Sequence, residues 1–143
     1  MWHTSTGIIK YDPPRPGMKR KTEWWAIVQI DREITRYYRW WVMKRYWIDL
    51  KQPAWDAHIS IIRGEKPKPD KMHLWKKYDG KKIEFQYSHF VQQAADKPEF
   101  WYVEVNCPLL REIRKEFGIP SNWHQHITVG KLQDKLLPAH YIL

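Results

Sequence analysis

Two short stretches of the chain share one pattern, and this repeat limits the possible folds more than any other feature. Residues 57–64 read AHISIIRG, and residues 123–130 read WHQHITVG. Each is apolar and rich in β-branched residues and ends in glycine, which predicts a short buried strand followed by a turn. Because side chains two apart on a strand share a face, each stretch places an imidazole beside a hydroxyl group.

The two pairs are His58 with Ser60 and His126 with Thr128, and in each pair the isoleucine between them should face the core. If the pairs face one another, they form a polar site that suits a phosphate ester. The usual pKa of histidine is about 6.5, so one ring can act as base while the other acts as acid near neutral pH. The hydroxyls would hold the non-bridging phosphate oxygens. These four are the candidate catalytic residues; two unrelated core strands are the alternative.

Chain length and charge limit the class of protein. The 143 residues predict a single domain, 1–143. An excess of 25 Lys and Arg over 16 Asp and Glu, net charge +9, favours an anionic partner: nucleic acid, a nucleotide or a membrane surface. A basic protein without such a partner is the alternative. Because bases stack on exposed rings, the 10 Trp and 8 Tyr favour nucleotides over lipid.

The cysteine content and the hydropathy indicate the compartment. A single cysteine, Cys107, excludes an internal disulfide and a thiolate metal cluster, and it fits a reducing environment. No apolar run approaches the roughly 18 residues of a membrane span, and the N-terminus lacks the apolar core of a signal peptide. We therefore expect a soluble, cytoplasmic protein with no membrane partner and no stable protein partner.

The order of the expected elements predicts an α+β fold with mainly antiparallel sheets. The basic, Pro-rich residues 1–21 predict a flexible arm. Periodicity and breakers predict strands at 24–30, 58–64, 82–87, 88–92, 100–106 and 126–130, and helices at 32–48, 72–78 and from Pro108 to a stop at Gly118. The succession strand, helix, His strand occurs twice. It predicts two lobes, roughly 22–70 and 71–143, related by a pseudo-twofold axis around a central cleft.

These features resemble the two-histidine (2H) phosphoesterase superfamily, in which a His-hydrophobic-Ser/Thr motif occurs twice in a small two-lobed chain. The likeness runs from about residue 24 to residue 131. Within this superfamily, the chain resembles the bacteriophage anti-CBASS phosphodiesterases most. The segments that carry this resemblance are PAW at 53–55, HISIIRGEKP at 58–67, WKKYDGKKIEF at 75–85 and HITVG at 126–130.

The resemblance implies a 2H phosphoesterase-like fold and a metal-independent phosphodiesterase without a cofactor. His58 and His126 would be general base and general acid, in an order that the sequence leaves open, and Ser60 and Thr128 would bind the scissile phosphate. The implied substrates are cyclic di- or oligonucleotide second messengers such as cGAMP, cleaved at a 3′–5′ bond in the host bacterial cytoplasm to evade CBASS defence.

Two other functions remain open from the sequence. One is an RNA-processing, 2′,3′-cyclic or 2′,5′ phosphodiesterase that uses the same four residues. The other is a non-catalytic sponge that sequesters a cyclic nucleotide, with the histidines as binding groups only.

Further residues are expected to bind the substrate. Trp75 and Trp123 could stack on bases, and Arg63 could attract phosphates. His124 shares a face with His126, but no third ligand stands at a standard metal-site spacing, so we expect no metal. Tyr11 is expected to close over the ligand, with the tail around Tyr141 as the alternative lid.

Overall fold

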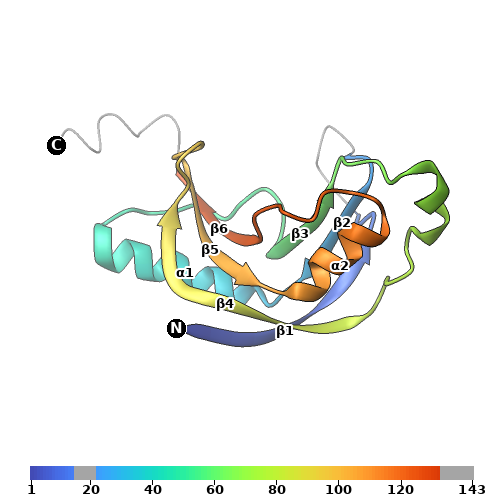
Figure 1. The fold of residues 1–143 in the computed structure, drawn as a ribbon. Coiled ribbons are helices and arrows are strands. Elements are labelled where there is room, and N and C mark those ends of the chain that lie inside the picture. Colours follow the sequence, from blue (N-terminus) through green and yellow to red (C-terminus); the bar gives the residue numbers. More distant parts are fainter. Residues whose placement is uncertain (15–21, 133–143) are drawn as a thin grey trace.

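The computed structural model describes residues 1–14 and 22–132, which form a six-stranded antiparallel sheet with two α-helices. The predicted α+β class and the antiparallel pairing are confirmed. In chain order (Figure 1) the elements are β1 (Trp2–Tyr11), β2 (Trp25–Gln29), α1 (Arg32–Tyr46), β3 (His58–Arg63), the 3-10 helix η1 (Pro69–Leu74), β4 (Lys82–Gln93), β5 (Phe100–Asn106), α2 (Pro108–Glu116) and β6 (His126–Lys131).

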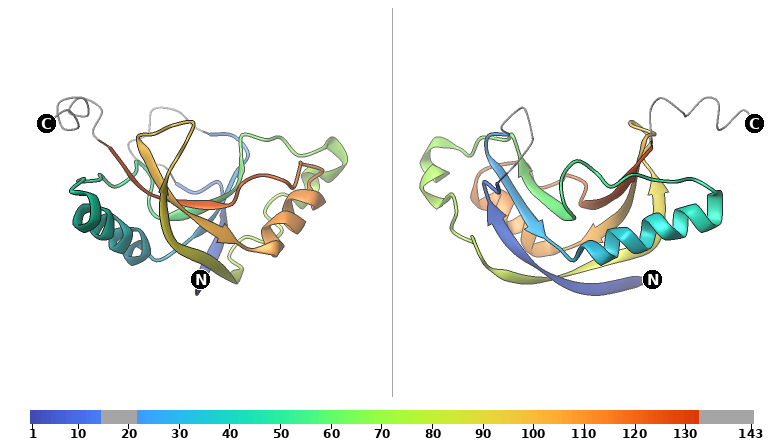
Figure 2. Two further views of the ribbon diagram at one scale, coloured as in Figure 1. Left: turned by 60° about the vertical axis from the view of Figure 1, so that its left-hand side comes forward. Right: turned by 180° about the vertical axis from the view of Figure 1, so that it is seen from behind.

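The sheet closes on itself in the order β1-β2-β3-β6-β5-β4. The series β1, β2, α1, β3 in the first part of the chain is followed by β4, β5, α2, β6 in the second, with η1 between them. Within the ring, β2 and β3 follow β1 just as β5 and β6 follow β4. Figure 2 shows α1 and α2 on opposite flanks of the sheet. The predicted order of strand, helix and His strand is therefore present twice.

Helix α1 begins where the sequence predicts. Asp31 is the N-cap, and its carboxylate accepts a hydrogen bond of 2.9 Å from the backbone N–H of Glu33. Tyr38 and Val42 face the core. Tyr37 is exposed, because the helical period turns it away from Val42.

Helix α2 also has the boundaries that its sequence predicts. Pro108 occupies the first turn, where the missing N–H costs no helical hydrogen bond. Leu110 and Ile113 are fully buried. Gly118 follows the helix with φ +72°, a conformation that glycine adopts without strain.

The two glycines after the His motifs differ. Gly64 has φ +76° and ends β3 in a turn, as expected. Strand β6 instead continues through Gly130 to Lys131, so the expected turn there is wrong. A Cβ at position 130 would lie 2.7 Å from Cβ of Leu50. Glycine is needed there for close packing and not for a turn.

The prediction of a flexible arm over residues 1–21 is wrong for its first half. Residues 2–11 form β1, which pairs with both β2 and β4. Gly7, Ile9 and Tyr11 alternate as buried positions, a period-two pattern that the neighbouring prolines obscured in the sequence. Residues 15–21 lie outside the described residues.

Two further elements differ from the prediction. The expected strands 82–87 and 88–92 are one bent strand, β4, which pairs with β1 through its first half and with β5 through its second. Ser88 falls within a register shift between Tyr87 and Val91, and its carbonyl accepts a 2.9 Å hydrogen bond from the hydroxyl of Tyr38. The expected helix 72–78 is a 3-10 helix over Pro69–Leu74 followed by turns. No helix in the described ranges is both long and apolar enough to cross a bilayer.

Candidate active site

The two His strands lie side by side. Ile59 of β3 is paired with Ile127 of β6, and both side chains are fully buried. Antiparallel pairing through this point puts His58 on the side of Thr128, and it puts Ser60 on the side of His126. Since neighbours along a strand point to opposite faces, all four polar side chains lie on the face away from the two isoleucines.

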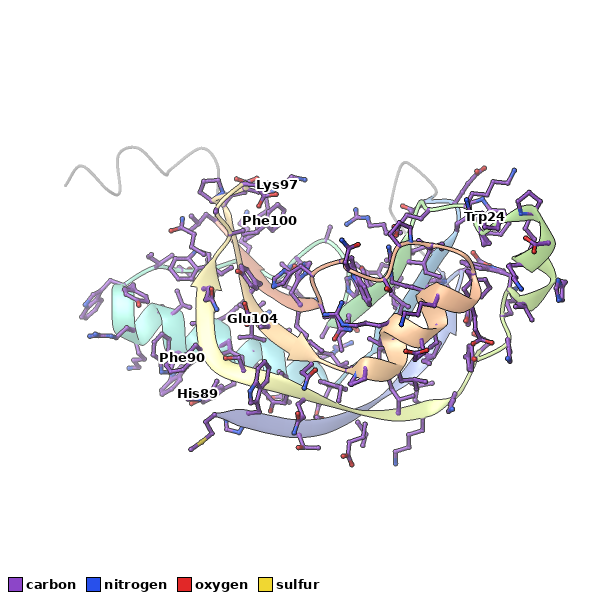
Figure 3. The ribbon with its side chains drawn as sticks, viewed as in Figure 1. Trp24, His89, Phe90, Lys97, Phe100 and Glu104 are labelled. Atoms are coloured by element: carbon purple, nitrogen blue, oxygen red, sulfur yellow. The ribbon has the colours of Figure 1, made fainter. Side chains whose placement is uncertain are left out.

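The four candidate catalytic residues line one cavity of about 340 Å³. A second cavity, of about 610 Å³, shares Arg63, Phe100, His126 and Thr128 with the first. The two cavities therefore meet at the second His motif. In Figure 3, Lys97 and Phe100 lie at one raised end of the sheet and Trp24 lies at the other.

The imidazole rings of His58 and His126 are oriented in the same way. The Nδ1 atom of His58 is 2.6 Å from the carbonyl oxygen of Asp56, and Nδ1 of His126 is 3.1 Å from that of His124. A carbonyl oxygen can only accept, so each Nδ1 carries the proton and donates it. In both rings Nε2 remains as the atom available for proton transfer.

The surroundings lower the pKa of both rings. For His58 the main cause is burial, and the positive charges of Arg63 and His126 add to it, against the hydrogen bond to the Asp56 carbonyl. For His126 burial is again the main cause, and the charge of His124 adds to it. Near pH 7 both rings are therefore largely neutral when no ligand is bound. A bound phosphate anion would favour protonation of either one.

The neighbours of the two rings differ in polarity. His58 packs edge-on against Trp25, with ring centroids 5.9 Å apart. The ring of His126 stacks on that of His124 at 5.2 Å, and Nε2 of His124 lies 3.7 Å from a carboxylate oxygen of Glu104. Across the described parts of the chain, no three His, Cys, Asp or Glu side chains converge as a metal site would require.

Arg114 is a residue of this site that the sequence-based prediction does not include. Its side chain is 2% exposed and lines the first cavity. It donates to both carboxylate oxygens of Glu65, at 2.7 Å to Oε1, and to the carbonyl of Ile61 at 2.8 Å. Its guanidinium lies 4.5 Å from the ring centroid of Trp123. A signal was present, because Arg114 follows Leu110 by four residues and so falls on the apolar stripe of α2.

Three of the predicted substrate-binding residues line the cavities. Trp123 lines the first cavity, His124 lines the second, and Arg63 lines both. The cavity also has two aromatic walls that were not predicted, Trp25 and Trp55, whose rings meet at 5.3 Å. Adjacent aromatic and apolar residues in the sequence give no indication of which ring will face a cavity.

Tyr11 and Trp75, which were also expected to bind the substrate, line neither of these two cavities. Tyr11 is 5% exposed and packs edge-on against Trp75 at 4.9 Å, and Trp75 packs on Phe117 at 5.5 Å. Burial also raises the pKa of Tyr11. Nε1 of Trp75 donates to Asp12 at 2.9 Å. Both rings therefore pack against other side chains of the fold. Tyr141, the alternative lid, lies outside the described residues.

The site thus combines three imidazoles, the hydroxyls of Ser60 and Thr128, cationic side chains and aromatic walls around adjoining cavities. This combination can transfer protons and can bind an anion that carries an aromatic group, such as a nucleotide. Comparison of the chain with known proteins gives no match to a protein-family model, to a curated protein or to a solved structure.

Proposed function

We propose that this protein is a metal-independent phosphodiesterase of the two-histidine type. Its substrates are cyclic di- or oligonucleotide second messengers, which it cleaves at a 3′–5′ bond, countering CBASS defence in the cytoplasm of a bacterial host. The observation that carries the proposal is that His58, Ser60, His126 and Thr128 line one cavity. The proposed architecture is two lobes related by a pseudo-twofold axis between β3 and β6.

Three features support the two-lobed interpretation. The same order of elements occurs twice. The two His strands pair through the isoleucines at the centre of the two motifs. Each imidazole donates from Nδ1 to the carbonyl two residues before it. A twofold relation accounts for all three, whereas two unrelated core strands would share none of them except by coincidence.

The proposed reaction needs one base and one acid. One imidazole takes the proton of a ribose 2′-hydroxyl, whose oxygen attacks the adjacent phosphorus. The bond from phosphorus to the 5′-oxygen breaks, and the other imidazole gives that oxygen a proton. The products are a 2′,3′-cyclic phosphate end and a 5′-hydroxyl end. Proton transfer by a positioned side chain contributes typically about 10² to 10⁴ in rate, and hydroxyl donors from Ser60 and Thr128 would stabilise the phosphorane.

The cavity walls support a nucleotide substrate. Trp123, Trp25 and Trp55 give the first cavity aromatic surface on which a base can stack. Arg63 lies where the two cavities meet and could bind a phosphate. A reacting phosphate near His126 and Thr128, where the two cavities meet, would have room for one nucleotide in each cavity.

The test is incubation with a 3′,3′-cyclic dinucleotide in excess EDTA, with products resolved by liquid chromatography and mass spectrometry. We expect a linear product with a 2′,3′-cyclic phosphate end from the wild type and from the control variant His73→Ala. His73 is an exposed histidine outside the cavities. We expect loss of product in His58→Ala and His126→Ala. Recovery of intact ligand from the denatured complex would identify a sponge instead, and activity confined to linear RNA would identify an RNA-processing enzyme.

A further inference from the structure

We propose that the outer face of α1 attaches the protein to an anionic phospholipid surface. This outer face is defined by Arg36, Tyr37, Trp40, Met43, Lys44 and Trp47, the last being the C-cap residue. The inference does not depend on the proposed phosphodiesterase function.

Exposed apolar side chains are concentrated on this helix. The large apolar residues exposed within the described chain are Met1, Trp2, Ile8, Tyr37, Trp40, Met43, Tyr46, Trp47 and Phe90, and five of these nine fall between residues 37 and 47. Trp40 is 52% exposed and Trp47 is 88% exposed. Single exposed apolar residues are normal, but a cluster of this kind marks an interaction surface.

The cluster forms one face of the helix. Trp40, Met43 and Trp47 are spaced by three and four residues, so they lie along one side. The opposite side carries Tyr38 and Val42, which are buried in the core. The helix thus has one aromatic face packed on the protein and a second aromatic face turned to solvent, which core packing does not explain.

The charges beside these rings are almost all positive. Arg36, Lys44 and Arg45 are exposed, and Glu33, which pairs with Arg36 at 3.2 Å, is the one acidic residue of α1. The whole chain has a net charge of +9. Trp and Tyr favour the boundary between lipid and water, and Lys and Arg extend toward anionic headgroups. The outer face therefore complements an anionic membrane surface in both polarity and charge.

Other occupants fit this face less well. A second copy of the chain would bring Lys44 and Arg45 against the same cations of its partner. A single-stranded nucleic acid would use the rings alone, since bases stack on aromatic faces, and Tyr37 and Trp40 already contact one another at a centroid distance of 6.0 Å and an interplanar angle of 31°. Met43 offers an aliphatic surface, which suits acyl chains.

Attachment through α1 would leave the candidate active site accessible. No residue of α1 lines either of the two cavities at the His motifs. Figure 2 shows α1 on one flank of the sheet, with α2 on the other. The inference departs from the sequence-based expectation of no membrane partner, because composition cannot show which aromatic rings are exposed.

The test is flotation of the full chain with vesicles of 30% phosphatidylserine and 70% phosphatidylcholine, compared with pure phosphatidylcholine. We expect binding to the anionic vesicles that weakens as salt rises, and at least tenfold weaker partitioning to the neutral ones. Two variants of the chain should also bind the anionic vesicles at least tenfold more weakly than the wild type. One is Trp40→Ala with Trp47→Gly, in which glycine keeps the positive φ of position 47. The other is Lys44→Glu with Arg45→Glu.

Matched controls distinguish this face from general stickiness. Phe90→Ala removes an exposed ring on β4, and Lys82→Glu reverses a charge on the same strand; both should bind vesicles like the wild type. Circular dichroism should show all variants folded. Absence of flotation, equal binding to neutral vesicles, or equal losses in the controls would overturn the inference. The inference would also be overturned if the protein dimerised through this face, or bound RNA but not vesicles, and if that property disappeared in the same two variants.

Discussion

Ile59 of β3 lies opposite Ile127 of β6, and both side chains are fully buried. This backbone pair joins the strand of the first His motif to the strand of the second. Because side chains alternate along a strand, burying the two isoleucines turns His58 and His126 to the opposite face, toward the same cavity. The packing of two apolar residues thus sets the separation of two imidazoles.

Truncation of one of these isoleucines should therefore destabilise the fold. Ile127→Ala should lower the free energy of unfolding by about 2–5 kcal/mol, because it removes buried methyl groups and leaves a cavity. Ile127→Val should cost only about 0.5–1.5 kcal/mol. Urea denaturation followed by circular dichroism measures both. A cost below about 1 kcal/mol for the alanine variant would mean that the position is not packed as described.

The two predicted stacking tryptophans should behave differently. Trp123→Ala should weaken binding of a cyclic dinucleotide about 5- to 150-fold, since base stacking on a ring is worth roughly 1–3 kcal/mol. Trp75→Phe should leave affinity unchanged, because Trp75 packs on Tyr11 and Phe117 outside both cavities. Calorimetric titration in a His58→Ala background measures affinity without turnover. Equal losses in the two variants would refute this assignment of the rings.

Local signals in the sequence were sufficient for several elements. The strand predicted at 100–106 coincides with β5, because its apolar residues alternate and a turn precedes it. The start of α1 after Asp31 and the end of α2 before Gly118 can each be predicted from one or two residues, because helix capping depends only on the immediate neighbours. The His–hydroxyl pairs follow from the same kind of local rule, the period of two along a strand.

Features that depend on distant partners were not predictable in this way. Strand β4 pairs with β1 as far as Ser88, its pairing with β5 shifts register between Tyr87 and Val91, and no local pattern specifies how the strand is shared between the two partners. Tyr11 and Trp75 both pack on Phe117, which is distant from them in the sequence. The ion pair between Arg114 and Glu65 joins α2 to the end of β3, and it needs both positions to be known at once.

The stability of the protein should fall with the protonation of His58 and His126 as the pH drops below 6.5. Burial lowers the pKa of both rings from the ordinary value of 6.5, so the unfolded chain binds more protons in this range. Their contribution to stability is present above pH 6.5 and is lost as the pH falls below it. Thermal melting of a His58→Gln and His126→Gln double variant should show a flatter pH dependence than the wild type. An unchanged dependence would contradict the lowered pKa values.

The carboxylate of Glu65 should stabilise the fold in a lower range. The hydrogen bond from Arg114 lowers the pKa of Glu65, so this contribution is present above pH 4.5 and is lost as the pH falls through the lowered pKa. Glu65→Ala should cost about 1–3 kcal/mol at neutral pH, because it leaves the buried guanidinium without its anion, while solvent screens the 40% exposed carboxylate. Glu65→Gln, which keeps an acceptor, should cost less. Chemical denaturation at pH 7 and pH 3 measures both, and equal costs at the two values would be inconsistent with the ion pair.

The central claim is that His58 and His126 act on one phosphorus atom. Its most direct test is kcat for cyclic dinucleotide cleavage in the wild type, His58→Ala, His126→Ala and the double variant. Each single substitution should lower kcat by about 10² to 10⁴. The double variant should lose much less than the product of the two single losses, since residues that act as a unit are not additive. Single variants that retain wild-type kcat, or losses that multiply fully in the double variant, would contradict the account.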